Sequence, residues 1–249
     1  VTSGVASSPS RLTAEGLPEP PAEDADDALH DQYTRELARW LLEHEMLVHA
    51  SAYIDRKNFS LRPETELPEE PFRMRTVRVR GHRGFPDGVM RAIAQLKFLE
   101  IAYFDYCKLS ESDLEQLGQG THRIRSLYFS HCELENDGFQ HIPKLNHLFS
   151  LNVDDCTIDD AALPHLEGTK LRILSIRNCD LTGSTLGAFA GSDQLTTLYL
   201  SGCPLSEEGF RQLSRLKRLQ VLNLDGTGLT DDALQLLGVL PSLRTLNLM

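Results

Sequence analysis

Hydrophobic residues recur at fixed positions of one pattern through the last two thirds of the chain. The pattern reads L-x-x-L-x-L-x-x-C-x-L, and its positions are numbered below from the first leucine. It is clearest in five segments: Ile124–Leu134, Leu148–Ile158, Leu171–Leu181, Leu195–Leu205 and Leu219–Leu229. Weaker copies begin at Met74 and Leu99, and a last copy begins at Leu243. This self-similarity predicts an array of stacked repeats.

Each copy contains two hydrophobic periods. At the fourth and sixth positions, apolar residues alternate with polar ones, which predicts a short strand. After the ninth position, apolar residues are spaced by three, as in Phe210 and Leu213 or Leu234 and Leu237, which predicts a short helix. One such unit cannot bury its apolar side alone, so several units must fold together.

The repeat resembles that of leucine-rich repeat proteins, and the resemblance covers residues 73–249. The usual Asn at the ninth position is replaced by Cys five times and by Thr227 once. In this respect the chain is similar to the Cys/Thr-type repeats of F-box-associated and planctomycete-type bacterial repeat proteins. The resemblance implies an α/β fold: a solenoid with a curved parallel β-sheet on its concave side and short helices on its convex side.

The five cysteines all fall at the ninth position of a copy: Cys107, Cys132, Cys156, Cys179 and Cys203. A redox or metal site is one interpretation. A column of buried thiols inside the solenoid is the favoured one, because every cysteine occupies the same repeat position. Reduced, buried thiols also favour a cytoplasmic location.

The segment before the repeats divides into two parts. Residues 1–28 are rich in Pro, Ala, Glu and Asp and are expected to form a disordered acidic linker. Residues 29–72 are expected to form a cap and connector: a helix over about 29–45, with Trp40 and Leu41 on its apolar face, and then a hairpin. A docking helix is the alternative to the cap. The start without Met suggests a processed chain or a fragment.

Charge is unevenly distributed along the chain. The formal net charge is -11, which argues against nucleic acid as a partner. Residues 1–72 hold 15 acidic and 6 basic residues, whereas the first repeat copy, residues 73–97, holds seven basic residues and one acidic residue. The acidity therefore belongs mainly to the linker and cap. No apolar stretch approaches the roughly 20 residues of a membrane-spanning helix.

Catalytic and metal-binding motifs are not evident in the sequence. It has neither a phosphate-binding GxxxxGK[ST] loop nor a GxSxG hydrolase elbow. His141 and His147 have no ligand partner at metal-site spacing. The acid pairs that precede the helices of two copies, Asp159-Asp160 and Asp231-Asp232, are expected to serve as helix caps. We therefore predict no enzymatic activity, no cofactor and no metal.

Candidate binding residues follow from the strand period, which turns the third, fifth, seventh and eighth positions away from the core. Four of the six tyrosines fall on this predicted concave face, where tyrosine is a favoured interaction residue; stacking within the sheet is the plainer alternative. The predicted partner-binding residues are Arg78, Arg80, Tyr103, Asp105, Tyr106, Tyr128, His131, Asp154, Arg177 and Tyr199.

These observations predict a non-enzymatic scaffold that recognises a protein or peptide through the concave face, and that is expected to be monomeric. A regulatory or sensor region of a larger signalling protein is an alternative. A substrate-recruiting subunit of a ubiquitin ligase is a further alternative, which only the resemblance implies, and no F-box-like helical segment is evident in the sequence.

Overall fold

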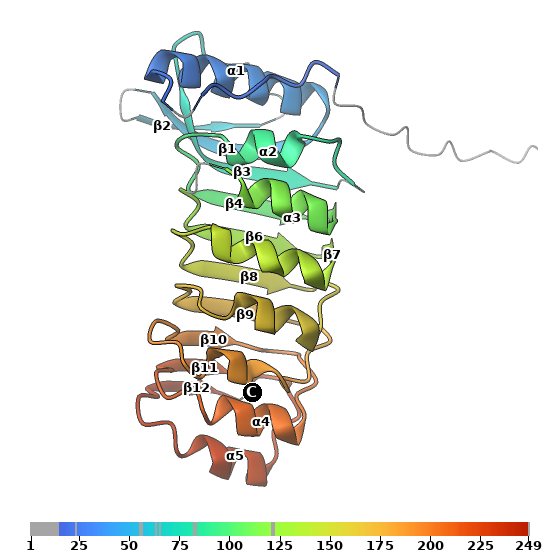
Figure 1. Ribbon diagram of the computed structural model, residues 1–249, viewed down its shortest axis with the longest axis vertical. Helices are drawn as coiled ribbons and strands as arrows, with labels where there is room; N and C mark the ends of the chain where they lie inside the picture. Colours follow the sequence, from blue (N-terminus) through green and yellow to red (C-terminus); the bar gives the residue numbers. More distant parts are fainter. Residues whose placement is uncertain are drawn as a thin grey trace, which may run out of the picture.

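The chain forms an elongated stack of strand-and-helix units (Figure 1). The structure is a computed structural model that describes residues 15–22, 24–54, 57–62, 64, 66–81, 84–120 and 123–248. Within these residues, ten strands make one sheet in the order β12-β11-β10-β9-β8-β6-β4-β3-β1-β2. The short helices lie together on one face of this sheet. The parallel-stranded solenoid expected from the repeats is thereby confirmed.

The strands shorten toward the C-terminal end of the stack. β3 spans Arg73–Arg80, whereas β11 and β12 have three residues each. The strands of the large sheet are β1 Leu47–Ile54, β2 Lys57–Leu61, β3 Arg73–Arg80, β4 Ile101–Asp105, β6 Ser126–Ser130, β8 Ser150–Asp154, β9 Ile173–Arg177, β10 Thr197–Tyr199, β11 Val221–Asn223 and β12 Thr245–Asn247; β5 Lys108–Leu109 and β7 Glu133–Leu134 form a separate small sheet.

The helical segments change type along the stack. Both η1 and η2 are 3-10 helices, and they contain Pro143 and Pro164, which lack the amide donor that a longer α-helix needs. The segments are α1 Asp27–Glu43, α2 Val89–Ala94, α3 Glu111–Gly118, η1 Asn136–Lys144, η2 Asp160–Leu166, η3 Leu186–Phe189, α4 Glu207–Leu213 and α5 Asp231–Leu237. The spacing by three therefore predicted the position of these helices but not their type.

The parallel strands pair without any shift in register, so equal positions of successive repeats lie side by side. At the fourth position, Leu127 pairs with Leu151, and Leu151 with Leu174. The side chain of Leu174 has 0% of its surface exposed. The sixth position continues the core, where the rings of Phe104 and Phe129 stack with centroids 5.6 Å apart. These columns bury the apolar side that a single repeat would expose.

The cysteine column is buried in the interior, as expected. The Cys132 thiol donates a hydrogen bond to the Phe104 carbonyl at 3.2 Å, and the Cys203 thiol to the Ile176 carbonyl at 3.3 Å. Each accepting carbonyl belongs to the sixth position of the preceding repeat. Burial raises the pKa of Cys179 to about 12. Burial also raises the pKa of Cys203, so Cys179 and Cys203 connect neighbouring repeats as neutral donors.

The acid pairs have more varied roles than simple capping. Asp159 is the N-cap of η2 and accepts a hydrogen bond from the Ala161 amide at 2.8 Å. Asp160 instead accepts bonds from the amide and the hydroxyl of Thr182 in the next repeat, at 2.8 and 2.6 Å. In α5 the N-cap is Thr230, and Asp231 and Asp232 lie in the first turn.

The segment before the repeats continues the same sheet. β1 pairs with β2 as an antiparallel hairpin and with β3 in antiparallel register. α1 buries Trp40 and Leu41, and Arg73 of β3 forms ion pairs with Asp27 and Asp31 of α1. The division into linker, cap and solenoid, and the cap role itself, stay predictions. The first half of the expected linker, residues 1–14, lies outside the described residues.

Truncation of a core leucine should show how strongly the stack depends on its columns. We expect Leu174→Ala to lower the free energy of unfolding by about 2–5 kcal/mol, because it opens a cavity between two repeats. Leu234→Ala is the matched control, because that side chain is 41% exposed, and it should cost less than about 1 kcal/mol. Chemical denaturation measures both, and equal losses would contradict the inward position of Leu174.

The cysteine column should resist chemical modification in the folded protein. Because all five thiols are buried away from solvent, we expect a thiol-labelling reagent to react slowly with the native protein. After denaturation, the same five thiols should react at the rate of free cysteine. Rapid labelling of several thiols in the native protein, detected by mass spectrometry, would show that the column is accessible.

Candidate interaction face

The sheet surface opposite the helices, the concave face, presents the odd positions of the strands in straight columns. At the fifth position, Arg78 pairs with Tyr103, and Tyr103 with Tyr128. The column continues through Asn152, Ser175, Tyr199, Asn223 and Asn247. The columns predicted from the repeat alignment are therefore present in the structure. Their role in binding stays a prediction.

The fifth-position column begins with a stack of one cation and two aromatic rings. The Arg78 guanidinium lies 4.8 Å from the centroid of the Tyr103 ring, and that ring stacks on Tyr128 with centroids 4.4 Å apart and planes at 17°. Such contacts favour both cation–π and aromatic attraction. Both tyrosines are half-buried. These two rings therefore do stack on each other within the sheet. The remaining ring surface is left partly exposed on the concave face.

A second stack runs parallel to the first, at the C-terminal ends of strands β3, β4 and β6. Arg80 lies 5.1 Å from the centroid of the Tyr106 ring, and Tyr106 stacks on His131 with centroids 4.7 Å apart. Tyr106 is 50% exposed. Stacking rigidifies these side chains before any partner arrives, so little rotamer entropy remains to be lost on binding.

The eighth position requires a left-handed backbone. Tyr106 has φ 57° and His131 has φ 52°, and the same position is Gly202 and Gly226 in later repeats. Glycine adopts this conformation without steric cost, whereas residues with a Cβ do so less readily. The first repeats thus place an aromatic ring where glycine would fit the backbone better.

Charges on the face are partly neutralised within it. The Arg78 Nε lies 2.8 Å from a carboxylate oxygen of Asp105. Burial nevertheless raises the pKa of the Asp105 carboxyl, while Arg78 opposes that rise. Burial also raises the pKa of the Tyr103 phenol, with a contribution from neighbouring Tyr128. These shifts show that the face is a partly desolvated surface.

A third group of polar side chains lies in the middle of the face. The Ser175 hydroxyl donates a hydrogen bond to Asp154 at 3.1 Å. Arg177 lies 4.8 Å from the centroid of the Tyr199 ring, and its Nε is buried without a hydrogen-bond partner among the described residues. Burial raises the pKa of the Asp154 carboxyl, and the Ser175 hydrogen bond and the charge of Arg177 oppose the rise. The ten predicted residues therefore form two groups. The aromatic-basic group contains Arg78, Arg80, Tyr103, Asp105, Tyr106, Tyr128 and His131, and the polar group contains Asp154, Arg177 and Tyr199.

One part of the face could not be predicted from the repeats. A hollow of about 340 Å³ lies where the hairpin meets the repeats, and it is lined by Ser51, Ala52, Ser60, Arg75, Thr76, Glu100 and Ile101. Its formation depends on the antiparallel pairing of β1 with β3. The repeat pattern contains no signal for this pairing, because the hairpin lies outside the array.

The face carries three main kinds of side chain and no cluster of metal-ligating groups among the described residues. Aromatic rings, guanidinium groups and carboxylates are arranged in columns, and within the described residues no group of three or more His, Cys, Asp or Glu side chains could hold a metal ion. Among the same residues, no helix is long and apolar enough to cross a membrane.

Comparison with known proteins identifies the repeat. The family model described as Leucine Rich Repeat matches residues 170–192 and 194–216. None of the curated proteins compared with the chain matches it in sequence.

Solved structures with a similar arrangement include two internalins of Listeria monocytogenes. Internalin InlF is 20% identical, with a TM-score of 0.47, and the match covers 63% of this chain and 49% of the internalin. Internalin C2 is 19% identical, with a TM-score of 0.47, and the match covers 71% of this chain and 81% of the other. The chain thus spans about half the length of the first of these.

A third similar structure is that of the Arabidopsis receptor kinase HAESA, solved in complex with the peptide hormone IDA and a co-receptor. It is 16% identical with a TM-score of 0.40, and the match covers 71% of this chain and 34% of the kinase chain.

The raised pKa of Asp154 should make stability depend on pH. A carboxyl whose pKa is higher in the folded than in the unfolded protein stabilises the fold below its unfolded pKa, and loses that contribution as pH rises through the folded value. We therefore expect the free energy of unfolding of the wild type, relative to Asp154→Asn, to fall as pH rises from about 4 to about 7. Denaturation at several pH values measures this difference. If the free energy difference between the wild type and Asp154→Asn rises with pH, the pKa of Asp154 is not raised in the folded protein.

Proposed function

We propose that this chain, which belongs to the leucine-rich repeat proteins, is a non-enzymatic scaffold that binds a protein or peptide on its concave face. The proposed contact residues are the aromatic-basic group at β3, β4 and β6, with the polar group at β8, β9 and β10 as a second contact. The observation that carries this proposal is the pair of Arg-aromatic stacks, in which Arg78 and Arg80 each begin a column of two rings.

The left-handed eighth position supports a role in binding for the second stack. A repeat array with no partner would gain backbone stability from glycine at this position, as found at Gly202 and Gly226. Tyr106 and His131 accept a less favourable backbone and leave half of the Tyr106 side chain exposed. Backbone strain of this kind is concentrated at functional sites. Recognition of a partner explains why aromatic residues occupy these positions.

The size of the face also suits a macromolecular partner. Eight parallel strands at about 4.8 Å spacing give a strip roughly 34 Å long, which is enough for a standard protein interface or an extended peptide. Tyrosine and arginine are enriched among residues that dominate binding energy. The half-buried, stacked tyrosines offer such area with their conformations already restricted.

We further propose that the protein acts as a monomer in a reducing compartment such as the cytoplasm. The burial of five cysteines at equivalent positions supports this location, because buried thiols of this kind belong to proteins kept reduced.

Removal of both stacked rings should abolish partner capture. We expect Tyr103→Ala with Tyr128→Ala to lose most of the protein captured by the immobilised wild type from extracts of its source cells, because both ring faces disappear. Loss of the ring pair itself should lower the free energy of unfolding by about 0.5–1.5 kcal/mol. Quantitative mass spectrometry of captured proteins, together with thermal unfolding, measures both effects.

Two control variants separate binding from folding. Tyr103→Phe with Tyr128→Phe keeps the stacked rings and should retain most of the capture. Lys144→Ala with Gln235→Ala changes exposed residues of the helical face and should leave capture unchanged. If the alanine double variant folds and captures the same proteins as the wild type, the concave face is not the binding surface.

A further inference from the structure

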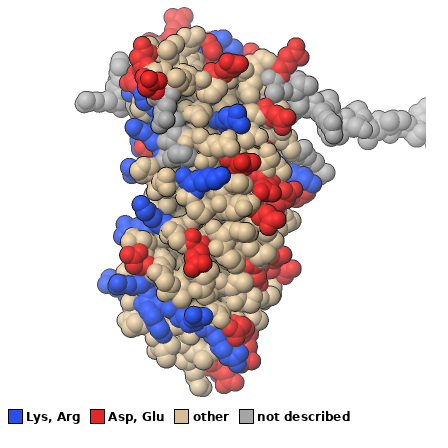
Figure 2. Space-filling view, in the orientation of Figure 1, with Lys and Arg blue, Asp and Glu red and all other residues tan. Residues whose placement is uncertain are grey.

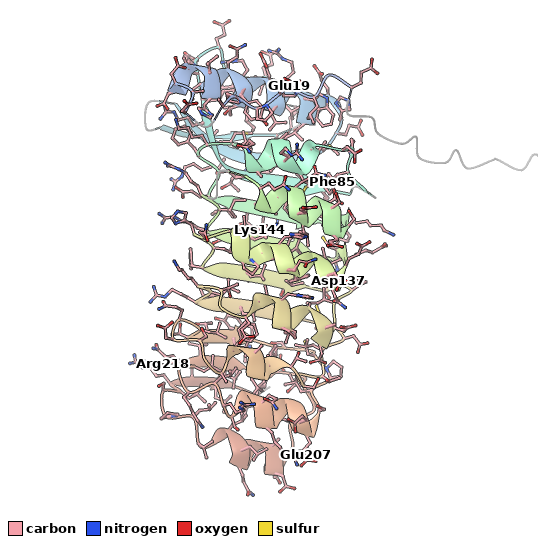
Figure 3. All side chains as sticks on the ribbon, viewed as in Figure 1. Glu19, Phe85, Asp137, Lys144, Glu207 and Arg218 are labelled. Carbon is pink, nitrogen blue, oxygen red and sulfur yellow. The ribbon has the colours of Figure 1, made fainter. Side chains whose placement is uncertain are left out.

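The two long edges of the solenoid carry opposite charge. Acidic residues gather at the edge where strands end and helices begin, and basic residues at the edge where strands begin (Figure 2). In Figure 3, Asp137 and Glu207 lie on the right-hand, acidic edge, and Arg218 lies on the left-hand edge. Acidic residues at helix N-termini are explained by the helix dipole. The helix dipole likewise favours cations at the helix C-termini on the basic edge, but Arg125 and Arg172 follow the ends of α3 and η2 by seven and six residues, beyond the last turn where that effect acts. The basic edge is separate from the concave face.

The middle of the basic edge contains an exposed phenylalanine between two arginines. The Phe149 amide donates to the Arg125 carbonyl at 3.0 Å, and the Arg172 amide donates to the Phe149 carbonyl at 2.8 Å. These bonds place the three residues side by side at the second position of three successive repeats. Two residues earlier in each repeat are Arg123, His147 and Lys170. We call these six residues the rim patch.

The rim patch is exposed to solvent, and most of its basic side chains form no ion pair with an acidic residue among the described residues. All six side chains are exposed, and Phe149 is 38% exposed. Among the described residues, the side chains of Arg125, Lys170 and Arg172 form neither an ion pair nor a hydrogen bond. Some basic residues elsewhere on the stack are neutralised: Lys97, for example, pairs with Asp27 at 2.9 Å. An uncompensated cation group around an exposed aromatic ring is a surface suited to a partner.

A hollow of about 240 Å³ borders the patch, and it is lined by Arg123, Arg125, His147 and Glu100. The Glu100 carboxylate lies 2.6 Å from an Arg75 nitrogen, so its charge is already paired. The Arg123 guanidinium lies 5.9 Å from the centroid of the Phe98 ring, and the Arg125 guanidinium is available on the wall of this hollow to an incoming anion.

We propose that the rim patch binds an extended acidic peptide segment of a partner protein. Arg125 and Arg172 are separated by two strand spacings, about 10 Å. Residues four positions apart in an extended peptide lie about 13 Å apart on the same face, a difference that the flexible Arg and Glu side chains can absorb. The fitting segment carries carboxylates four positions apart, one for each arginine, and an apolar or aromatic side chain midway between them for the Phe149 ring, because alternate residues of an extended peptide share one face. Carboxylates match the guanidinium fork in geometry as well as charge.

The borders of the patch favour a peptide over nucleic acid. At the C-terminal side of the patch, a neighbouring hollow includes Glu167 and Asp193 beside Lys170. A nucleic acid carries regularly spaced phosphates on a long backbone and needs an extended basic surface, whereas these carboxylates interrupt the basic edge. The net charge of -11 also opposes a long polyanion. A short acidic segment needs only the three successive repeats that carry the patch.

Fluorescence anisotropy with a labelled synthetic peptide tests the proposal. The probe is an extended eight-residue peptide with glutamates four positions apart, a tryptophan midway between them, and Ser and Gly elsewhere; the matched probe has Gln in place of both glutamates. We expect the wild type to bind the Glu peptide saturably at low salt and to lose affinity as salt rises. Arg125→Ala with Arg172→Ala should weaken binding about tenfold, since two exposed charge pairs are lost, and Phe149→Ala should weaken it several-fold.

Matched controls distinguish this surface from the rest of the molecule. Arg218→Ala with Arg244→Ala removes two exposed cations of the same edge, two or more repeats away, and should change affinity less than twofold. Tyr103→Ala with Tyr128→Ala should also leave peptide binding unchanged, so failure of the concave-face proposal and failure of this one are distinguishable. Thermal unfolding confirms that each variant is folded.

Several outcomes would overturn the proposal. These are an absence of saturable binding to the Glu peptide, equal binding of the Gln peptide, and an Arg125→Ala with Arg172→Ala variant that binds as well as the wild type. A larger effect of the distant arginines would show that binding follows net charge alone. Tighter binding of an eight-nucleotide thymidine oligonucleotide, lost in the same double variant, would assign the patch to nucleic acid instead.

Discussion

In-register stacking of parallel repeats is the constraint on which the rest of this structure depends. A single repeat has an apolar side formed by its fourth and sixth positions, and it has nothing of its own to cover that side. Pairing such as Leu151 with Leu174 brings equal positions together, so every apolar column is continuous. A shift by one residue would move leucines to the concave face and polar residues into the core. The register is therefore fixed by the same burial that makes the stack stable.

The same register arranges residues that contribute little to the core. A residue type that recurs at one position becomes a column, whether it is a buried thiol such as Cys132 or an exposed ring such as Tyr106. Neighbours in a column are one strand spacing apart, which is close to the stacking distance of aromatic rings. The stack of Tyr103 on Tyr128 follows from this spacing. Recognition surfaces on this fold are thus built along the columns, across the strands.

The proposed concave site and the rim patch use this geometry in different ways. On the concave face, Arg78 is paired with Asp105 and covered on one side by Tyr103, so its positive charge is partly neutralised within the protein. On the rim, Arg125 and Arg172 flank Phe149. The concave face is suited to a partner that contributes contact area, and the rim to one that contributes negative charge. A single extended partner could engage both, and two partners could bind separately.

Much of the fold could be predicted from the sequence, because a repeat multiplies a weak local signal. The strand positions, the buried cysteines and the columns of the concave face all followed from one alignment. The 3-10 form of η1 and η2 did not follow, because spacing by three does not separate helix types.

Interactions between columns and beyond the array were harder to predict. The alignment placed Arg78 and Asp105 on one face, but their ion pair depends on side-chain conformation. The rim patch was missed because alternation marks the third, fifth and seventh positions as exposed, whereas Phe149 occupies the second position, at the edge of the sheet. The pairing of β1 with β3 was missed because it joins a hairpin to the array without a repeat signal.

Site-specific photo-crosslinking would test the central claim, that the concave face of the stack is the surface that meets a partner. A benzophenone amino acid would replace Tyr128 on the concave face in one protein and exposed Gln140 on η1 in another. We predict that, after irradiation in extracts of the source cells, a partner is cross-linked from position 128 and not from position 140. Cross-linking of the same partner from position 140 alone would contradict the account.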